Sequence, residues 1–170
     1  MAAAHPSLSD LEFRALLPEH ASALHSLLNR VVAEGKYLAS QTAFALPVVE
    51  QFLYQNCLSA NPQFALWRGA ELQGWCDAVR SVAKSQLARL GMGLAADYRG
   101  QGLGKQMLKL LQQHCLTLDI EQLELQVFAD NDAAIGLYLN CGFEVVGCRQ
   151  KPMLRSGKSV DVVIMSWSLG

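Results

Sequence analysis

The stretch YRGQGLGK, residues 98–105, decides the fold of this chain. It joins an apolar run, residues 90–94, to a helical pattern over residues 103–118, which predicts a strand, a glycine turn and a helix in succession. Such a turn points free backbone N–H groups at the space before the helix, where the helix dipole adds partial positive charge. A phosphate group is the natural guest there, and Arg99 and Lys105 would reinforce the charge.

The composition indicates one globular domain. The chain has 170 residues, of which 51% are hydrophobic and 17% charged, so it can bury a good core. We expect residues 1–10 to form a flexible tail and residues 11–170 to form a single domain. The net charge of -1 argues against a nucleic-acid partner. No secretory signal is recognisable and no apolar run approaches the roughly 20 residues of a membrane span, which argues against a membrane partner.

The cysteines and histidines show neither a disulfide framework nor a metal-binding pattern. An odd number of cysteines without CxxC spacing is most simply explained by free thiols in a reducing cytosol, which predicts a cytoplasmic protein. The histidines form no ligand pattern with them, so no metal is expected. The residues concerned are Cys57, Cys76, Cys115, Cys141, Cys148, His5, His20, His25 and His114.

Taken in order, the chain predicts a mixed α/β fold with the element order β-α-α-β-β-β-α-β-α-β-β. We expect a mostly antiparallel central sheet flanked by helices, because hairpins lie on both sides of one strand-helix-strand unit. The expected strands are 11–17, 63–68, 72–82, 86–95, 123–128, 143–154 and 159–169, and the expected helices begin at Pro18, at Pro47, at Leu103 and after Asp130 or Asn131.

Two finer expectations concern burial. The last strand, 159–169, is apolar on both faces, which is typical of a central strand covered on both sides. It should form a final hairpin around Ser156 and Gly157. The residues of the second helix that we expect on its inner side are Val48, Val49, Phe52, Leu53 and Leu58.

The glycine turn alone does not identify a ligand. Its glycines lack the G-x-G-x-x-G spacing of a dinucleotide fingerprint, and no GK[ST] follows as in a Walker A loop. A tight turn between strand and helix without any ligand is the alternative.

The segment RGQGLG, residues 99–104, resembles the R/Q-x-x-G-x-G/A signature of the GCN5-related N-acetyltransferases (GNAT), which bind acetyl-CoA. Residues 125–143 resemble the later L-x-V…N-x-x-A-x-x-L-Y-x-x-x-G-F block of that family. The resemblance covers nearly the whole chain. It is greatest to bacterial acetyltransferases of amino acids, of amino-acid-like herbicides or of ribosomal protein N-termini. It implies an acetyl-CoA-dependent N-acetyltransferase with a small-molecule amine or a protein N-terminus as acceptor, and it suggests a homodimer.

The resemblance also implies a coenzyme A site on both sides of the turn. The pyrophosphate would lie at the turn, and the pantetheine arm would pair with the preceding strand as an added strand does. In the family this strand carries a bulge and diverges from the strand at 123–128; Gly91 and Gly93 are compatible with a bulge, with close approach, or with packing against a bulky neighbour. The implied cofactor-binding residues are Met92, Gly93, Leu94, Arg99, Gly100, Gln101, Gly102, Leu103, Gly104, Lys105, Asn131 and Tyr138.

Amide formation from a thioester requires a neutral amine, donors for the developing oxyanion and a proton for the leaving thiolate. The backbone of residues 92–94 can supply the donors. Tyr138 matches the family tyrosine that acts as general acid toward the thiolate, and its alternative is a core tyrosine. Asn131 matches the asparagine that contacts pantetheine, and it can also cap the helix that follows it.

The general base is where this sequence departs from the family pattern. Several relatives have glutamate at the position of Gln126, and an amide cannot take a proton from an ammonium group. Glu124 projects from the same face of that strand and is a candidate base, with a solvated edge charge as the alternative. Glu34 and Asp77 are further carboxylates that could reach a pocket. The remaining alternative is that the small fraction of free amine at neutral pH suffices without a dedicated base.

The end of the first helix and the loop after it resemble the acceptor wall of the family. Glu34, Tyr37 and Thr42 lie there, and a carboxylate would suit a cationic amine; a solvated loop is the alternative. We take Glu34, Tyr37 and Gln126 as the candidate substrate residues.

No cysteine matches an acyl-enzyme nucleophile, so direct transfer is expected. The rival functions are a non-catalytic acyl-CoA-binding module and a nucleotide-binding enzyme.

Overall fold

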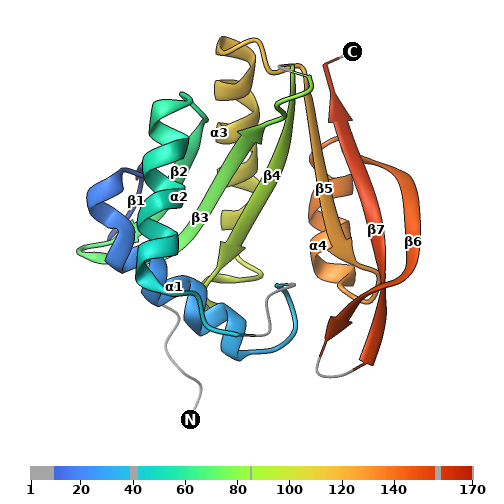
Figure 1. Ribbon diagram of the computed structural model, residues 1–170, viewed down its shortest axis with the longest axis horizontal. Coiled ribbons are helices and arrows are strands. Elements are labelled where there is room, and N and C mark those ends of the chain that lie inside the picture. Colours follow the sequence, from blue (N-terminus) through green and yellow to red (C-terminus); the bar gives the residue numbers. More distant parts are fainter. Residues whose placement is uncertain (1–9, 39–41, 85, 156–157, 170) are drawn as a thin grey trace.

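A computed structural model of the protein describes residues 10–38, 42–84, 86–155 and 158–169 (Figure 1). The expected tail lies outside the described residues except for Asp10, and the expected turn at Ser156 and Gly157 lies outside them too. The strands are β1 (Leu11–Ala15), β2 (Gln63–Arg68), β3 (Glu71–Arg80), β4 (Leu87–Leu94), β5 (Gln122–Phe128), β6 (Glu144–Arg155) and β7 (Lys158–Ser168). The helices are α1 (Ala21–Ala33), α2 (Leu46–Leu58), α3 (Leu103–Thr117) and α4 (Asp132–Leu139), with 3-10 turns at Pro18–His20 and Ala96–Tyr98.

The strands form one sheet in the order β1-β2-β3-β4-β5-β7-β6. Only β4 and β5 pair in parallel, and every other neighbouring pair is antiparallel. The parallel pair is joined through α3, as a strand-helix-strand crossover requires. The predicted fold class and element order are therefore confirmed.

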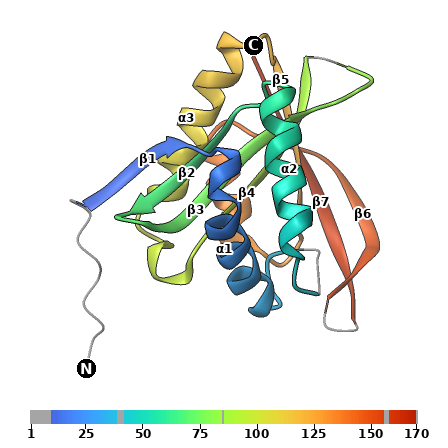
Figure 2. The same ribbon diagram turned by 60° about the vertical axis from the view of Figure 1, so that its left-hand side comes forward.

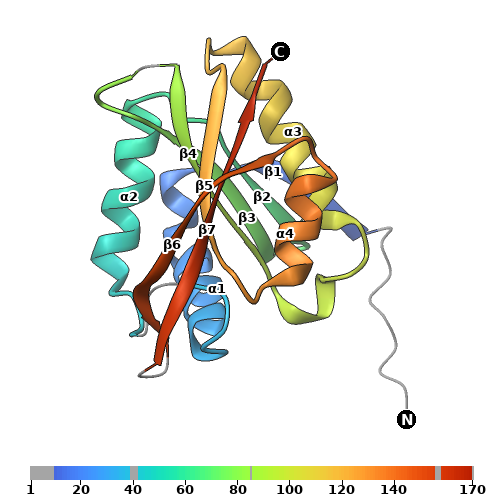
Figure 3. The ribbon, with the colours of Figure 1, turned by 90° about the vertical axis from the view of Figure 1, so that its right-hand side faces the viewer.

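Helices cover the two faces of the sheet as separate layers. Figure 2 shows α1 and α2 in front of β2–β4, and Figure 3 shows α3 and α4 on the opposite side. Because neighbouring residues of a strand point to opposite faces, each layer has its own apolar core. Buried members on the α1/α2 side include Leu24, Leu53 and Trp75, and on the α3/α4 side Leu66, Met107 and Leu123. Among the described residues no helix is long and apolar enough to cross a membrane.

Helix α2 buries fewer of its apolar residues than the sequence pattern predicts. Val49 and Leu53 are buried, but Val48, Phe52 and Leu58 are 56%, 36% and 63% exposed. The buried residues recur at intervals of about one turn, so α2 packs through one narrow stripe rather than a broad apolar face. The sequence pattern could not show how little of the helix would be covered.

Strand β7 lies between β5 and β6, which confirms its central position. The expected cover on both faces holds only at its middle, where Val162 and Met165 lie on opposite faces and are buried, while the other described residues of the strand are partly or fully exposed. Val163 and Trp167 pack against the α3/α4 core. On the other face α1 and α2 stand over β2–β4 and leave β7 without a helix in front of it (Figure 1).

Candidate active site

Strands β4 and β5 diverge at the centre of the sheet. They pair only through Leu87–Arg89 and Gln122–Glu124. Beyond this point β5 stays with β7, while β4 stays with β3 as far as Leu94. Residues 90–94 therefore turn one edge of backbone N–H and C=O groups toward a slot, and no described strand pairs with that edge. The divergence is confirmed. Of the alternatives for Gly91 and Gly93, the bulge that the resemblance implies is absent from the β3–β4 ladder, which runs without any shift in register.

Two glycines of β4 let side chains of β3 lie directly against its backbone. A Cβ atom at Gly93 would lie 2.4 Å from the ring of Trp75, so this glycine packs against a bulky neighbour. A Cβ atom at Gly91 would lie 3.2 Å from each carboxylate oxygen of Asp77. Both contacts are on the α1/α2 face, because Trp75 belongs to the core on that side.

The glycine turn follows β4 by way of the 3-10 turn at Ala96–Tyr98. Gly100 and Gly102 have φ angles of 72° and 77°, the left-handed region that glycine adopts without strain. Gly102 is the N-cap of α3 and has no side chain to bond the first N–H groups of the helix. Within the described residues, the N–H groups of residues 100–105 have no backbone partner. The turn therefore has the free donors that an anion requires.

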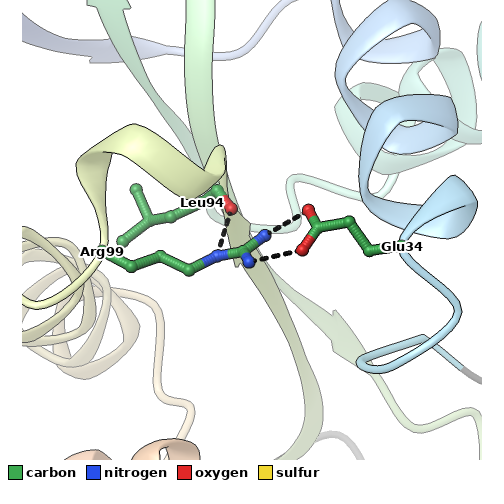
Figure 4. A network of polar contacts seen from close by, with 3 residues as sticks. All are labelled: Glu34, Leu94 and Arg99. Carbon is green, nitrogen blue, oxygen red and sulfur yellow. Dashed lines mark hydrogen bonds and ion pairs between the residues drawn. The ribbon is translucent and has the colours of Figure 1, made fainter. Parts of the chain in front are cut away.

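The side chain of Arg99 faces away from these donors. Its Nε donates to the Leu94 carbonyl oxygen at 2.9 Å, and its two terminal nitrogens donate to the Glu34 carboxylate at 2.6 and 2.7 Å (Figure 4). The guanidinium carbon also lies 4.4 Å from the centre of the Tyr37 ring. The expected extra charge at the turn is therefore neutralised by Glu34, and Glu34 is not a free carboxylate for an amine. Hydrogen bonding to Arg99 lowers the pKa of Glu34.

An open pocket of about 500 Å³ lies on the α1/α2 side of the sheet. Leu123 and Leu125 face the α3/α4 core, so Glu124 and Gln126 share the opposite face, as the strand pattern predicts. Of the candidate base and substrate residues in the sequence, only Glu124 and Asp77 line this pocket, and Gln126 is exposed elsewhere on β5. The remaining lining comes from Phe52, Val79, Arg80, Ser81, Leu87, Ala88, Arg89, Leu90 and Gly91.

Asp77 is the buried acid of this pocket. It is 5% exposed, and burial raises the pKa of its carboxyl to about 7, while a hydrogen bond from the Trp75 side chain lowers it by less. Within the described residues, no lysine, arginine or histidine forms an ion pair with it. Near neutral pH this carboxyl therefore exists in both protonation states.

Tyr138 and Asn131 lie on the α3/α4 side. Tyr138 is buried on α4 with its ring centre 5.6 Å from that of Phe143, and burial raises the pKa of its phenol to about 12. The Asn131 carbonyl oxygen accepts from the Ala134 N–H at 3.3 Å, which confirms that Asn131 caps α4. Tyr138 is a core residue, and it is also a phenol that stays protonated at neutral pH.

A second open pocket of about 440 Å³ lies where the loop after α1, the start of α4 and the β6–β7 hairpin meet. Arg155 forms an ion pair with Asp130 and donates to the Lys36 carbonyl oxygen at 3.3 Å. Its guanidinium carbon lies 5.0 Å from the centre of the Phe128 ring. Arg155 could not be recognised from the sequence, because its partners come from distant parts of the chain. The described residues contain no group of three or more His, Cys, Asp or Glu side chains placed to hold a metal ion.

Comparison with known proteins places this arrangement in a family. The chain is 30% identical over 91 residues to the L-amino acid N-acetyltransferase AaaT of Escherichia coli (strain K12), and this match spans 53% of the chain and 56% of that protein, about half of each. It is 27% identical over 130 residues to the ribosomal protein bS18 alanine N-acetyltransferase of the same organism, over 76% of the chain and 86% of that protein.

A solved structure shows the same fold. The crystal structure of the ribosomal-protein-alanine N-acetyltransferase from Brucella melitensis matches with a TM-score of 0.87 at 21% identity, over 93% of this chain and 99% of that one. Residues 34–143, which include the slot, the glycine turn and Tyr138, match the acetyltransferase (GNAT) family. The chain therefore belongs to the GNAT family of acetyltransferases.

Proposed function

We propose that this protein transfers an acetyl group from acetyl-CoA directly to a primary amine. The observation that carries the proposal is the continuity of the slot with the glycine turn. The unpaired edge of β4 ends at Leu94, and the free N–H groups follow at residues 100–105. A pyrophosphate held at the turn would let the pantetheine arm lie along β4 and pair with its backbone.

The residues around the turn fit this co-substrate. A Cβ atom added at Gly100 or Gly102 would have no neighbour within 4 Å, so the turn is open on that side. Lys105 is exposed and has no ion-pair partner within the described residues, which leaves it as the cation beside a phosphate. The Gln101 side chain donates to the Asp97 carbonyl oxygen at 2.6 Å, which holds the turn together.

The chemistry divides among groups on the two sides of the slot. Acetyl-CoA, when bound, supplies an acetyl group activated as a thioester. Backbone N–H groups of residues 92–94 would stabilise negative charge on an oxygen beside them. Tyr138, whose burial keeps it protonated, would donate a proton to a departing thiolate. Asn131 would hold the start of the helix that carries Tyr138 and contact the pantetheine arm.

The acceptor would enter on the α1/α2 side. A pocket of about 500 Å³ suits a small amine or the end of a peptide. The similar proteins named above include an L-amino acid enzyme and ribosomal-protein enzymes, so a free amino acid and a protein N-terminus are both within the proposal. The proposal also includes a cytoplasmic location and a homodimer. Sedimentation equilibrium measures the molar mass in solution and so tests for the homodimer.

Release of free CoA thiol tests the proposal. The purified chain is mixed with acetyl-CoA and, in turn, with free alanine, spermidine and a trialanine amide. We expect steady release that depends on one of these amines. A non-catalytic acyl-CoA-binding module would bind acetyl-CoA and release no thiol with any amine in a broader panel. A nucleotide-binding enzyme would be stabilised against heat by NAD or ATP and not by acetyl-CoA.

A further inference from the structure

We infer that Asp77 receives the amino group of the acceptor and takes its proton. This inference rests on the proposed function and names the residue that performs one of its steps. Its observations are independent of the glycine turn, because they come from β3, from the start of the slot and from the pocket on the α1/α2 side.

The position of Asp77 is set by the β3–β4 ladder. Asp77 pairs with Gly91, and the absence of a side chain at Gly91 lets both carboxylate oxygens lie against the β4 backbone. Arg89 and Glu124 form the last β4–β5 pair, so Gly91 lies two residues into the unpaired edge of β4. The carboxylate therefore lies where the pocket meets the beginning of the slot.

The surroundings of Asp77 lack a cation that pairs with it. The other charged groups lining the pocket are Arg80, Arg89 and Glu124, and helix α2 contributes only the apolar Phe52. Within the described residues, none of these groups forms an ion pair with Asp77. A buried carboxylate without a cationic partner is unfavourable, and an ammonium group entering the pocket would supply that partner.

The other carboxylates are placed less well for this role. Glu34 is held by Arg99 near the far end of β4, at Leu94. Glu124 is opposite Arg89, where β4 and β5 are still paired, and it is only half-buried. Gln126 cannot accept a proton from an ammonium group. Asp77 is the carboxylate that combines burial, access to the pocket and contact with the unpaired part of β4.

The step is a single proton transfer. One N–H bond of the ammonium group breaks, its electron pair remains on nitrogen as the lone pair, and the proton joins a carboxylate oxygen of Asp77. The neutral amine then faces the slot, and the proton later leaves to water through the open pocket. A carboxyl with a pKa of about 7 is well matched to this task, because it is partly ionised at neutral pH and still basic enough to accept the proton.

The test compares Asp77→Asn with Glu124→Gln and with a surface control, Asp119→Asn. The control makes the same chemical change at an exposed turn residue with a φ of 55°, a conformation that asparagine tolerates. For each variant, kcat/KM is measured from pH 6 to 10 with whichever of free alanine, spermidine and trialanine amide the wild type acetylates fastest. Acetyl-CoA affinity is measured by calorimetry.

We expect Asp77→Asn to lower kcat/KM at pH 7 by about 100-fold or more, and to lose the rise in activity that follows ionisation of a group near pH 7. Its activity should recover toward pH 10, where the amine is neutral without help. Acetyl-CoA affinity should stay within twofold of the wild type, which shows that the variant is folded. In thermal unfolding, Asp77→Asn should melt higher than the wild type at pH 8 and at the same temperature at pH 4.

Wild-type kcat/KM and an unchanged pH profile in Asp77→Asn would overturn this inference and leave the proposed function standing. The inference would also be overturned if the rise in kcat/KM near pH 7 were lost in Glu124→Gln and kept in Asp77→Asn. If Asp77→Asn does not bind acetyl-CoA, Gly91→Ala replaces it: the added Cβ presses on both Asp77 oxygens, and an unchanged pH profile would then overturn the inference. A wild-type protein that releases no thiol with any amine overturns both proposals.

Discussion

Arg99 and Glu34 join the end of β4 to the end of α1 through two short hydrogen bonds of 2.6 and 2.7 Å. A third bond, from Arg99 Nε to the Leu94 carbonyl oxygen, holds the guanidinium beside the last residue of the strand (Figure 4). The residue that opens the glycine turn is thereby tied to helix α1, on the α1/α2 side of the sheet. Any displacement of the end of α1 relative to Leu94 must therefore strain or release this contact.

Breaking the ion pair between Arg99 and Glu34 should lower the free energy of unfolding only slightly, but a double-mutant cycle should still detect their interaction. Both side chains are slightly over a quarter exposed, and ion pairs in such positions contribute about 0.2–1 kcal/mol. The bidentate geometry favours the upper end of that range. We expect Arg99→Ala, Glu34→Ala and the double variant to give a coupling free energy of about 1 kcal/mol in urea unfolding. The more exposed pair of Arg14 and Glu12 serves as the control and should give close to zero; equal values for both pairs would contradict the prediction.

Tyr138→Phe should separate catalysis from cofactor binding. Removing the hydroxyl takes away the proposed proton donor and leaves the buried ring in place, so kcat should fall by about 100-fold or more. Acetyl-CoA affinity should remain within twofold of the wild type. Because burial raises the pKa of this phenol to about 12, the wild type should show no loss of activity from its ionisation below pH 10. Tyr54→Phe, at an exposed tyrosine of α2, is the matched control, and an unchanged kcat in Tyr138→Phe would remove the acid role.

Gly102→Ala should weaken acetyl-CoA binding through the backbone. The left-handed conformation at this residue would cost an alanine about 1–2 kcal/mol, and relief of that strain would turn the N–H groups of the turn away from the pyrophosphate. Gly69→Ala is a matched control, because its φ is 57° and its added Cβ would also have no neighbour within 4 Å. We expect similar losses of stability in urea unfolding for both variants and a large loss of acetyl-CoA affinity for Gly102→Ala alone. Equal affinities would count against the turn as the anion site.

The buried carboxyl of Asp77 should make stability depend on pH with a definite sign. Its folded pKa of about 7 lies above the usual aspartate pKa of 3.8, so between these two pH values the folded state holds a proton that the unfolded state releases. This contribution to stability is present below pH 4 and is lost as the pH rises toward 7; about three pKa units correspond to roughly 4 kcal/mol at most. The free energy of unfolding of Asp77→Asn minus that of the wild type should therefore increase from pH 4 to pH 7 and then level off. A difference that stays constant over this range would contradict the prediction.

Local sequence was enough to predict the elements around the glycine turn. Strand β2 has the predicted bounds, and Asn131 caps α4 as expected, because these features depend on neighbouring residues. Gly100 and Gly102 adopt the conformations for which a glycine turn was expected. Periodicity and turn chemistry act over a few residues, so the sequence displays them directly.

Features that depend on residues distant in the chain could not be predicted from the sequence. Glu34 is 65 residues from Arg99 along the chain, and nothing near either residue indicates that they pair. Exposure of Val48 and Phe52 depends on how much of α2 the rest of the fold covers. Asp77 stood out in the sequence only as one carboxylate among several; its contact with Gly91 is a product of β3–β4 register.

The β3–β4 register determines both the pairing of the two strands and the face on which Asp77 lies. Side chains alternate along β3, so a slip of one residue against β4 would turn Asp77 toward α3 and bring Cys76 to the acceptor face. The Asp77 carboxylate could then no longer take part in the proposed proton transfer, although the sheet kept its hydrogen bonds. Substitutions far from the slot that loosen β3 should consequently abolish the proposed acetyl transfer while the fold still unfolds cooperatively. Loss of activity in such variants would then indicate a shift of β3 against β4 rather than unfolding.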